Sequence, residues 1–184
     1  MSISSQGKRT RRICVNAMLC AVAMLLSYLE ALLPLQVLPI PGFRLGLANV
    51  AVVAVFCLLS PLDAAIVSSV RIVLMGLLFG TVTSFYFSLL GGVFSFLMLI
   101  LLRAVGRRCS YVGVSVLCAA AHNTGQICAA VTLFGAALIP SYLPLLLFAS
   151  VIYGGVIGLL LNLLLPRLQP HVCRLLGNAL EGVK

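Results

Sequence analysis

Residues 83–102, TSFYFSLLGGVFSFLMLILL, form a run of 20 amino acids without a charged side chain. An α-helix needs about 20 predominantly apolar residues to cross the hydrocarbon core of a bilayer. The rest of the 184-residue chain has the same character, because 62% of all residues are hydrophobic and only 8% are charged. This composition excludes an ordinary soluble globule and predicts an integral membrane protein.

Charged residues, prolines and glycines divide the chain into six apolar segments. The second segment is short and follows a proline-rich stretch, which indicates a helix that ends inside the protein. The sequence therefore predicts an all-α membrane protein with six transmembrane helices in one domain, residues 13–165. A basic N-terminus, residues 1–12, and a basic tail, residues 166–184, flank this domain. The predicted spans are 13–33, 45–59, 63–80, 83–102, 111–133 and 142–165.

The basic residues predict how the chain is oriented, because cytoplasmic loops carry an excess of lysine and arginine. With six spans and a cytoplasmic N-terminus, no basic cluster is left on the outer side, so both termini are expected in the cytoplasm. Orientation and attraction to anionic lipid account for this charge. The residues placed inside are Lys8, Arg9, Arg11, Arg12, Arg103, Arg107, Arg108, Arg167, Arg174 and Lys184.

The net charge of +9 does not indicate nucleic-acid binding, because the basic residues do not gather on one amphipathic or aromatic-rich element. The first apolar run is interpreted as a retained span, since Glu30 and several prolines follow it where a signal peptidase would cleave. The cysteines stand alone and are interpreted as small buried hydrophobic residues, with no disulfide or metal role. They are Cys14, Cys20, Cys57, Cys109, Cys118, Cys128 and Cys173.

Two predicted spans contain polar residues near their centres. Arg71 lies about ten residues into the third span and His122 about eleven into the fifth, so at about 1.5 Å per residue both are near the midplane. In AHNTGQ, residues 121–126, His122 and Gln126 are one turn apart and Asn123 lies about 100° round the helix. Each group loses water in a bilayer and needs a partner, which makes this arc a candidate site.

Small residues beside this arc allow another helix to approach closely, so the polar groups are expected to face the bundle. One interpretation is an interhelical hydrogen-bond clamp, worth about 0.6 to 2 kcal/mol. The other is a ligand pocket, since an arginine at the midplane costs about 2.5 kcal/mol or more. Arg44 and Arg71 favour a carboxylate or phosphate ligand, unless Glu30 neutralises one of them. The small residues are Cys118, Ala121, Gly125 and Ala129.

Asp63 has a structural explanation that does not involve a site. In SPLD, Ser60 is a suitable N-cap and Pro61 suits the first helical position. Asp63 then falls in the first turn, where the helix dipole favours a negative charge. We therefore predict that the third helix begins here.

Four motifs carry a resemblance to a known family: PGFRLGLANV (41–50), SLLGGVFSFLM (88–98), AHNTGQ (121–126) and YLPLLL (142–147). Together they resemble the bacterial Gx transporter family, also called heptaprenyl diphosphate synthase component I. That family is similar to the substrate-binding S components of energy-coupling-factor transporters. The resemblance implies a six-helix protein of the bacterial cytoplasmic (inner) membrane, with a binding site near the outer surface that the loop between the first two helices closes.

By position, the resemblance implies that the loop and several helices contribute substrate-binding residues. S components bind a transmembrane coupling subunit and two ATPases, and small residues on the first helix make that contact; Ala17 and Ala21 fit this role, although ordinary helix packing explains such a pair equally well. The chain has no GxxxxGK[ST] motif, so energy for transport is expected from partners. The substrate-binding candidates are Arg44, Asn49, Arg71, His122, Asn123 and Gln126.

The family name raises an enzymatic alternative that the acidic residues do not support. Prenyl synthases hold magnesium diphosphate with paired aspartate-rich motifs, whereas this chain has only Glu30, Asp63 and Glu181, which are scattered. Hard cations need several oxygens at one point. We therefore expect no independent catalysis, no metal and no cofactor. A second possibility stays open: a membrane accessory of prenyl diphosphate or quinone synthesis, or of an extracytoplasmic redox system.

Overall fold

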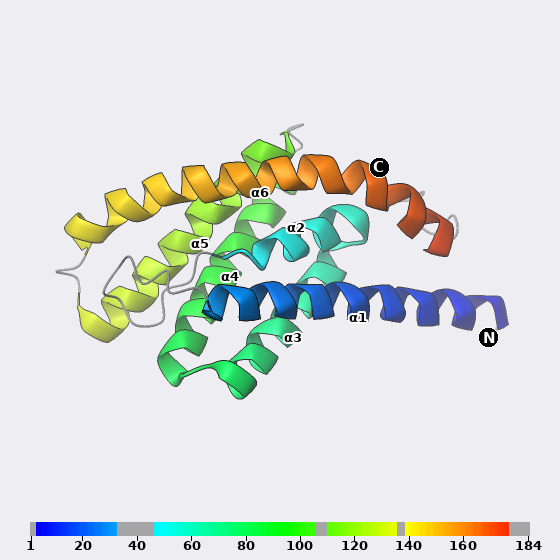
Figure 1. Ribbon diagram of the computed structural model, residues 1–184, viewed down its shortest axis with the longest axis horizontal. Coiled ribbons are helices and arrows are strands. Elements are labelled where there is room, and N and C mark those ends of the chain that lie inside the picture. Colours follow the sequence, from blue (N-terminus) through cyan, green and yellow to red (C-terminus); the bar gives the residue numbers. More distant parts are fainter. Residues whose placement is uncertain (1–2, 33–45, 106–109, 136–138, 177–184) are drawn as a thin grey trace.

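The computed structural model describes residues 3–32, 46–105, 110–135 and 139–176, and these residues form helices without any strand (Figure 1). The helices are α1 (Ile3–Leu32), α2 (Asn49–Leu58), α3 (Pro61–Phe79), α4 (Val82–Ala104), α5 (Tyr111–Phe134) and α6 (Ile139–Leu176). All of them except α2 contain a stretch long and apolar enough to cross a membrane. The structure therefore confirms the predicted all-α fold with several helices that could span a membrane.

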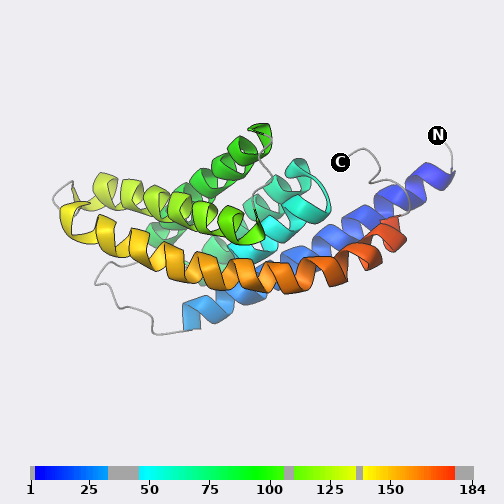
Figure 2. The same cartoon turned by 90° about the horizontal axis from the view of Figure 1, so that it is seen from above.

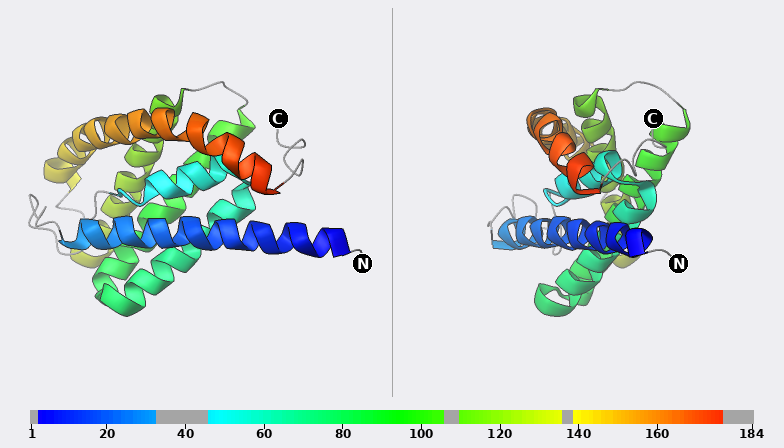
Figure 3. Two further views of the ribbon diagram at one scale, coloured as in Figure 1. Left: turned by 45° about the vertical axis from the view of Figure 1, so that its right-hand side comes forward. Right: turned by 90° about the vertical axis from the view of Figure 1, so that its right-hand side faces the viewer.

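The short helix α2 lies at the centre of the molecule. It contacts α1, α3, α5 and α6, and eight of its ten residues are buried. Figure 3 shows it enclosed between α1, α3 and α6. Its 10 residues are too few to span a bilayer. The prediction that the second segment ends inside the protein therefore agrees with the structure.

The outer elements pack in sequence order around this centre. The helices α4, α5 and α6 form two antiparallel hairpins with α5 between its neighbours (Figure 2), while α3 packs across α1 (Figure 1). Small residues permit the α4–α5 contact, because a Cβ atom built on Gly125 would lie only 2.5 Å from the carbonyl oxygen of Leu90. The stripe that contains Gly125 is buried, so the arc beside it faces the bundle as predicted.

The predicted start of α3 is confirmed. Ser60 is the N-cap, its hydroxyl accepts a hydrogen bond from the Asp63 amide at 3.2 Å, and Pro61 is the first helical residue. The hydroxyls of Thr81 and Ser110 cap α4 and α5 in the same way. Local sequence signals therefore set where these helices begin.

The first and last helices are longer than predicted. The helix α1 begins at Ile3 within the expected N-terminal segment, and α6 continues to Leu176 through Pro166 and Pro170. A proline removes one backbone hydrogen bond without removing those of its neighbours, and α6 is visibly curved (Figure 3). Val172, beyond both prolines, is buried in the core cluster around α2. Tertiary packing therefore stabilises the extension.

Candidate binding site

The centre of the candidate site is a pair of side chains on α5. The Nε2 atom of His122 and the Nε2 atom of Gln126 are 3.0 Å apart, and the two residues are 3% and 1% exposed. Because Gln126 Nε2 is a donor, this bond is made by the histidine tautomer whose Nε2 accepts. The predicted one-turn spacing thus produces a direct contact inside the bundle.

The imidazole of His122 is held between two glycines from other elements. A Cβ atom built on Gly91 of α4 would lie 2.6 Å from His122 Cε1, and one built on Gly46, just before α2, would lie 3.2 Å from His122 Cδ2. The same atom on Gly46 would lie 3.1 Å from Asn49 Nδ2. Asn49 and His122, predicted from separate parts of the chain, therefore meet around Gly46.

Glu30 is the residue that sequence reasoning did not assign to the site. Its Oε1 accepts a hydrogen bond from the amide of Gly46 at 2.7 Å, and its Oε2 accepts one from the amide of Leu47 at 3.0 Å. These amides precede α2, where unpaired N–H groups and the helix dipole attract an anion. The sequence shows that an acid lies at the end of an apolar span, but it does not indicate which groups bind the carboxylate.

Arg71 of α3 contacts the same face of α1 as this contact, one turn away along the helix. It is 5% exposed, and its Nη1 donates a hydrogen bond to Ser27 Oγ of α1 at 3.3 Å. Ser27 and Glu30 are one turn apart on the buried face of α1. The helix α1 therefore connects Arg71 to the contacts around Gly46. We call the set Ser27, Glu30, Asn49, Arg71, His122 and Gln126 the polar belt.

Asn123 is explained by helix packing. Its Nδ2 donates a hydrogen bond to the carbonyl of Leu146 in α6 at 2.8 Å, which is the interhelical clamp considered from the sequence. The neighbouring Thr124 hydroxyl bonds within α5, to the carbonyl of Ala120 at 2.8 Å. Two polar residues of AHNTGQ thus have structural partners, while His122 and Gln126 belong to the polar belt.

Three further residues that the sequence analysis singled out are not part of the polar belt as the structure describes it. Arg44 lies outside the described residues, so its place relative to the polar belt stays a prediction. Ala17 and Ala21 of α1 are both exposed on the surface of the bundle. Packing among the described residues therefore does not account for the pair.

A second polar cluster lies near the start of α3. The guanidinium of Arg12 forms an ion pair with Asp63, and its Nη2 donates to Ser60 Oγ at 2.9 Å. Asn16 Nδ2 donates to Asp63 Oδ1 at 2.7 Å. We call these four residues the Asp63 cluster. The sequence predicted the cap formed by Ser60 and Asp63 but not the two residues of α1, since nothing local relates positions 47 to 51 residues apart.

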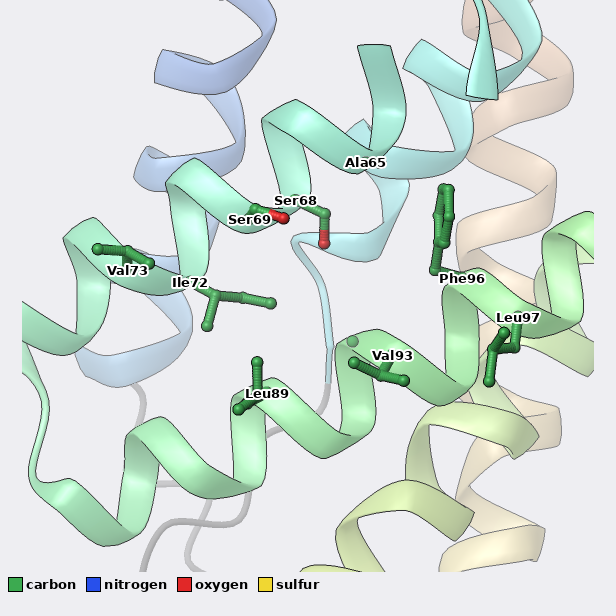
Figure 4. A pocket seen from close by; sticks show the side chains of 10 residues that line it. Ala65, Ser68, Ser69, Ile72, Val73, Leu89, Val93, Phe96 and Leu97 are labelled. Carbon is green, nitrogen blue, oxygen red and sulfur yellow. The ribbon is translucent and has the colours of Figure 1, made fainter. Parts of the chain in front are cut away.

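A groove lies between α3 and α4, with a cavity volume of about 190 Å³ (Figure 4). Its lining is mostly apolar, and the hydroxyl groups of Ser68 and Ser69 lie on its α3 side. Arg71 of the same helix bonds instead to α1. The groove is therefore suited to an apolar chain and is separate from the polar belt. It is lined by Ala65, Ser68, Ser69, Ile72, Val73, Leu89, Gly92, Val93, Phe96 and Leu97.

The fold and these contacts define a class: a multi-pass helical membrane protein with polar and charged groups buried inside the bundle. Comparison with protein families gives a match over residues 19–164 to the family described as heptaprenyl diphosphate synthase component I. The chain belongs to this family, as the four sequence motifs predicted. Comparisons with curated proteins and with solved structures give no match.

Proposed function

We propose that this protein is the substrate-capturing membrane subunit of an energy-coupling-factor-type uptake transporter. In this proposal it binds a small anionic or amphipathic metabolite, such as a vitamin or a prenyl or quinone precursor, from the outer side of the bacterial cytoplasmic membrane. Both termini lie in the cytoplasm, as the basic residues favour. The observation that carries the proposal is the polar belt, which gathers polar side chains from α1, α2, α3 and α5 inside an apolar bundle.

Helix packing alone does not require so many buried polar groups. One asparagine or glutamine suffices for an interhelical clamp, and Asn123 already provides one to α6. The polar belt adds an acid, a base, an imidazole and two amides, all 7% exposed or less. Polar and charged groups inside a membrane protein are typical of substrate pathways. The guanidinium of Arg71 supports a ligand with a negative charge.

The proposed role is binding without catalysis by this chain. Glu30 and Asp63, the two acids among the described residues, lie in separate clusters: Glu30 is near the end of α1, and Asp63 of α3 contacts residues near the middle of α1. Energy for transport then comes from a transmembrane coupling subunit and ATPase subunits. The exposed pair Ala17 and Ala21 on α1 supports a contact with the coupling subunit, because small residues let helices approach closely in a membrane.

The direct test is native mass spectrometry of the gently purified protein. We expect a retained small molecule in the wild type, and its loss in Arg71→Ala and in His122→Ala while both variants still insert and fold. Asn123→Ala is the matched control: it removes a buried amide of the same arc whose bond goes to α6, so it is expected to destabilise the protein and keep the ligand. Retention of the ligand in both belt variants would reject the proposed site.

A second candidate function is supported by the family description and by the apolar groove between α3 and α4. In this alternative the protein is a membrane accessory of prenyl diphosphate or quinone synthesis, or of an extracytoplasmic redox system. Copurification separates the two. A transporter subunit is expected to bring down a coupling subunit and ATPases and to lose them in Ala17→Leu and Ala21→Leu. An accessory is expected to bring down a synthase or redox enzyme and to tolerate both substitutions.

A further inference from the structure

One stripe of mostly exposed residues runs along the outer face of α6. Successive members are separated by four, three, four and three residues, which is the spacing of one helix face. Four of the five are exposed and Gly155 is half-buried. We call this set the α6 stripe: Phe148, Ile152, Gly155, Leu159 and Asn162.

Most of the stripe is what a lipid-facing helix should present, but Asn162 is not. It lies in GLLLNLLLP, with three leucines on each side, and its side chain is exposed. Among the described residues it has no hydrogen-bond partner. It is five residues before Arg167, or about 7.5 Å along the axis, which places its amide on the membrane side of that charge in the expected orientation. An amide without a partner is unfavourable there.

Gly155 is the second member that the chain itself does not explain. A Cβ atom built on the neighbouring Gly154 would lie 2.6 Å from Val116 Cα, and one on Gly158 would overlap Val112 Cα, so both glycines let α5 approach. A Cβ atom on Gly155 would meet nothing within 4 Å. Glycine is less favourable than alanine within a helix. Its position two turns before Asn162 on the same face indicates a close contact with another helix.

We propose that the α6 stripe is the contact surface between two copies of this chain in the membrane. All copies insert with the same orientation, so a two-fold axis along the membrane normal sets two α6 helices side by side with the same face inward. A carboxamide has both donors and an acceptor, so Asn162 is complementary to Asn162 of a second copy. The open space at Gly155 lets the two backbones approach at the same contact.

This pairing needs no other partner, which is the reason to favour a second copy. Acyl chains offer neither donor nor acceptor at this depth, whereas a symmetric dimer satisfies both amides at once. A buried asparagine pair also selects one register between two helices. The contact uses α6, and the coupling-subunit contact proposed above uses α1, so the two proposals stand or fall separately.

The test is self-association of the full-length protein in liposomes, measured by energy transfer between donor- and acceptor-labelled copies over a range of protein-to-lipid ratios. We expect transfer above the level of random proximity for the wild type. Asn162→Leu and Gly155→Leu are each expected to weaken association by about 3- to 30-fold. Asn162→Gln keeps the amide group and is expected to retain most of the association.

Leu164→Phe is the control for added bulk, because Leu164 is exposed and lies two residues after Asn162, about 160° round the helix from it. It is expected to leave association unchanged. Helical content and thermal unfolding of each variant show that it has folded. Transfer at the random level for the wild type at every ratio would overturn the proposal. So would equal association of the wild type, Asn162→Leu and Gly155→Leu.

Discussion

The polar belt and the Asp63 cluster both join α1 to its neighbours, and they differ in how much water reaches them. In the Asp63 cluster the side chain of Arg12 is 49% exposed, although that of its partner Asp63 is only 6% exposed. The charged and amide residues of the polar belt are between 1% and 7% exposed. A half-exposed ion pair costs little to form and contributes little, whereas buried polar groups are costly unless each is satisfied.

The two clusters also differ in the role that their contacts indicate. Capping of α3 and attachment of α1 explain every bond of the Asp63 cluster. The polar belt gathers an acid, a base, an imidazole and two amides inside the bundle, and we propose that a ligand accounts for this set. Variants that remove one group at a time from each cluster should therefore differ in both stability and ligand retention.

The largest effect is expected for Glu30→Ala. This change removes the acceptor of the buried amides of Gly46 and Leu47, so the free energy of unfolding should fall by about 2 to 5 kcal/mol. Glu30→Gln keeps one acceptor oxygen and should lose less. The free energies of unfolding of the two variants can be measured in mixed micelles. Wild-type stability of Glu30→Ala would show that the carboxylate does not hold the start of α2.

A smaller effect is expected when the space around His122 is filled. Gly91→Ala places a methyl group against the imidazole and should destabilise the protein by about 1 to 3 kcal/mol, with reduced ligand retention. Gly113→Ala is the matched control on α5, since its added Cβ atom would meet only Ser110 Oγ, at 3.5 Å. This control should be neutral or slightly stabilising. Equal unfolding curves for the two variants would contradict the packing of His122.

The pair of His122 and Gln126 can be measured by a double-mutant cycle. Their hydrogen bond within the bundle should give a coupling energy of about 0.6 to 1.7 kcal/mol. The control cycle combines His122 with Thr124, whose hydroxyl bonds to Ala120, and should be additive within about 0.5 kcal/mol. A cycle that gives the same value for both pairs would show that the contact of His122 with Gln126 is not specific.

The smallest effect is expected for Arg12→Ala. A half-exposed ion pair is worth about 0 to 1 kcal/mol, and salt should reduce this contribution further. Ligand retention should not change, because the Asp63 cluster is separate from the polar belt. Unfolding at low and high salt, together with native mass spectrometry, checks both statements. Loss of the ligand in this variant would remove the distinction between the two clusters.

Much of the fold was predictable because its signals are local or periodic. Runs of apolar residues located the spans, SPLD located the start of α3, and the small residues of α5 predicted which face turns inward. The ends of α1 and α6 were not predictable in this way. Charges and prolines were expected to end these helices, but packing of residues such as Val172 against the core outweighs those local preferences.

The site was predictable only in part, for a similar reason. One-turn spacing on α5 led to the pair His122 and Gln126, and the family motifs led to Asn49. Asn123 looks equivalent in the sequence, yet its amide turns to α6. Glu30 was not assigned to the site because its partners are backbone amides 16 and 17 residues away, which no side-chain pattern reveals.

The sequence by itself determined that this is a helical membrane protein, where most helices lie and which face of α5 is buried, because hydrophobicity and helical periodicity act over a few turns. Only the tertiary structure decided that α2 is the central helix, that Glu30 binds the amides just before it and that α1 also binds Arg71. These contacts join residues far apart in the chain. They depend on how complete helices pack, which short-range sequence patterns do not encode.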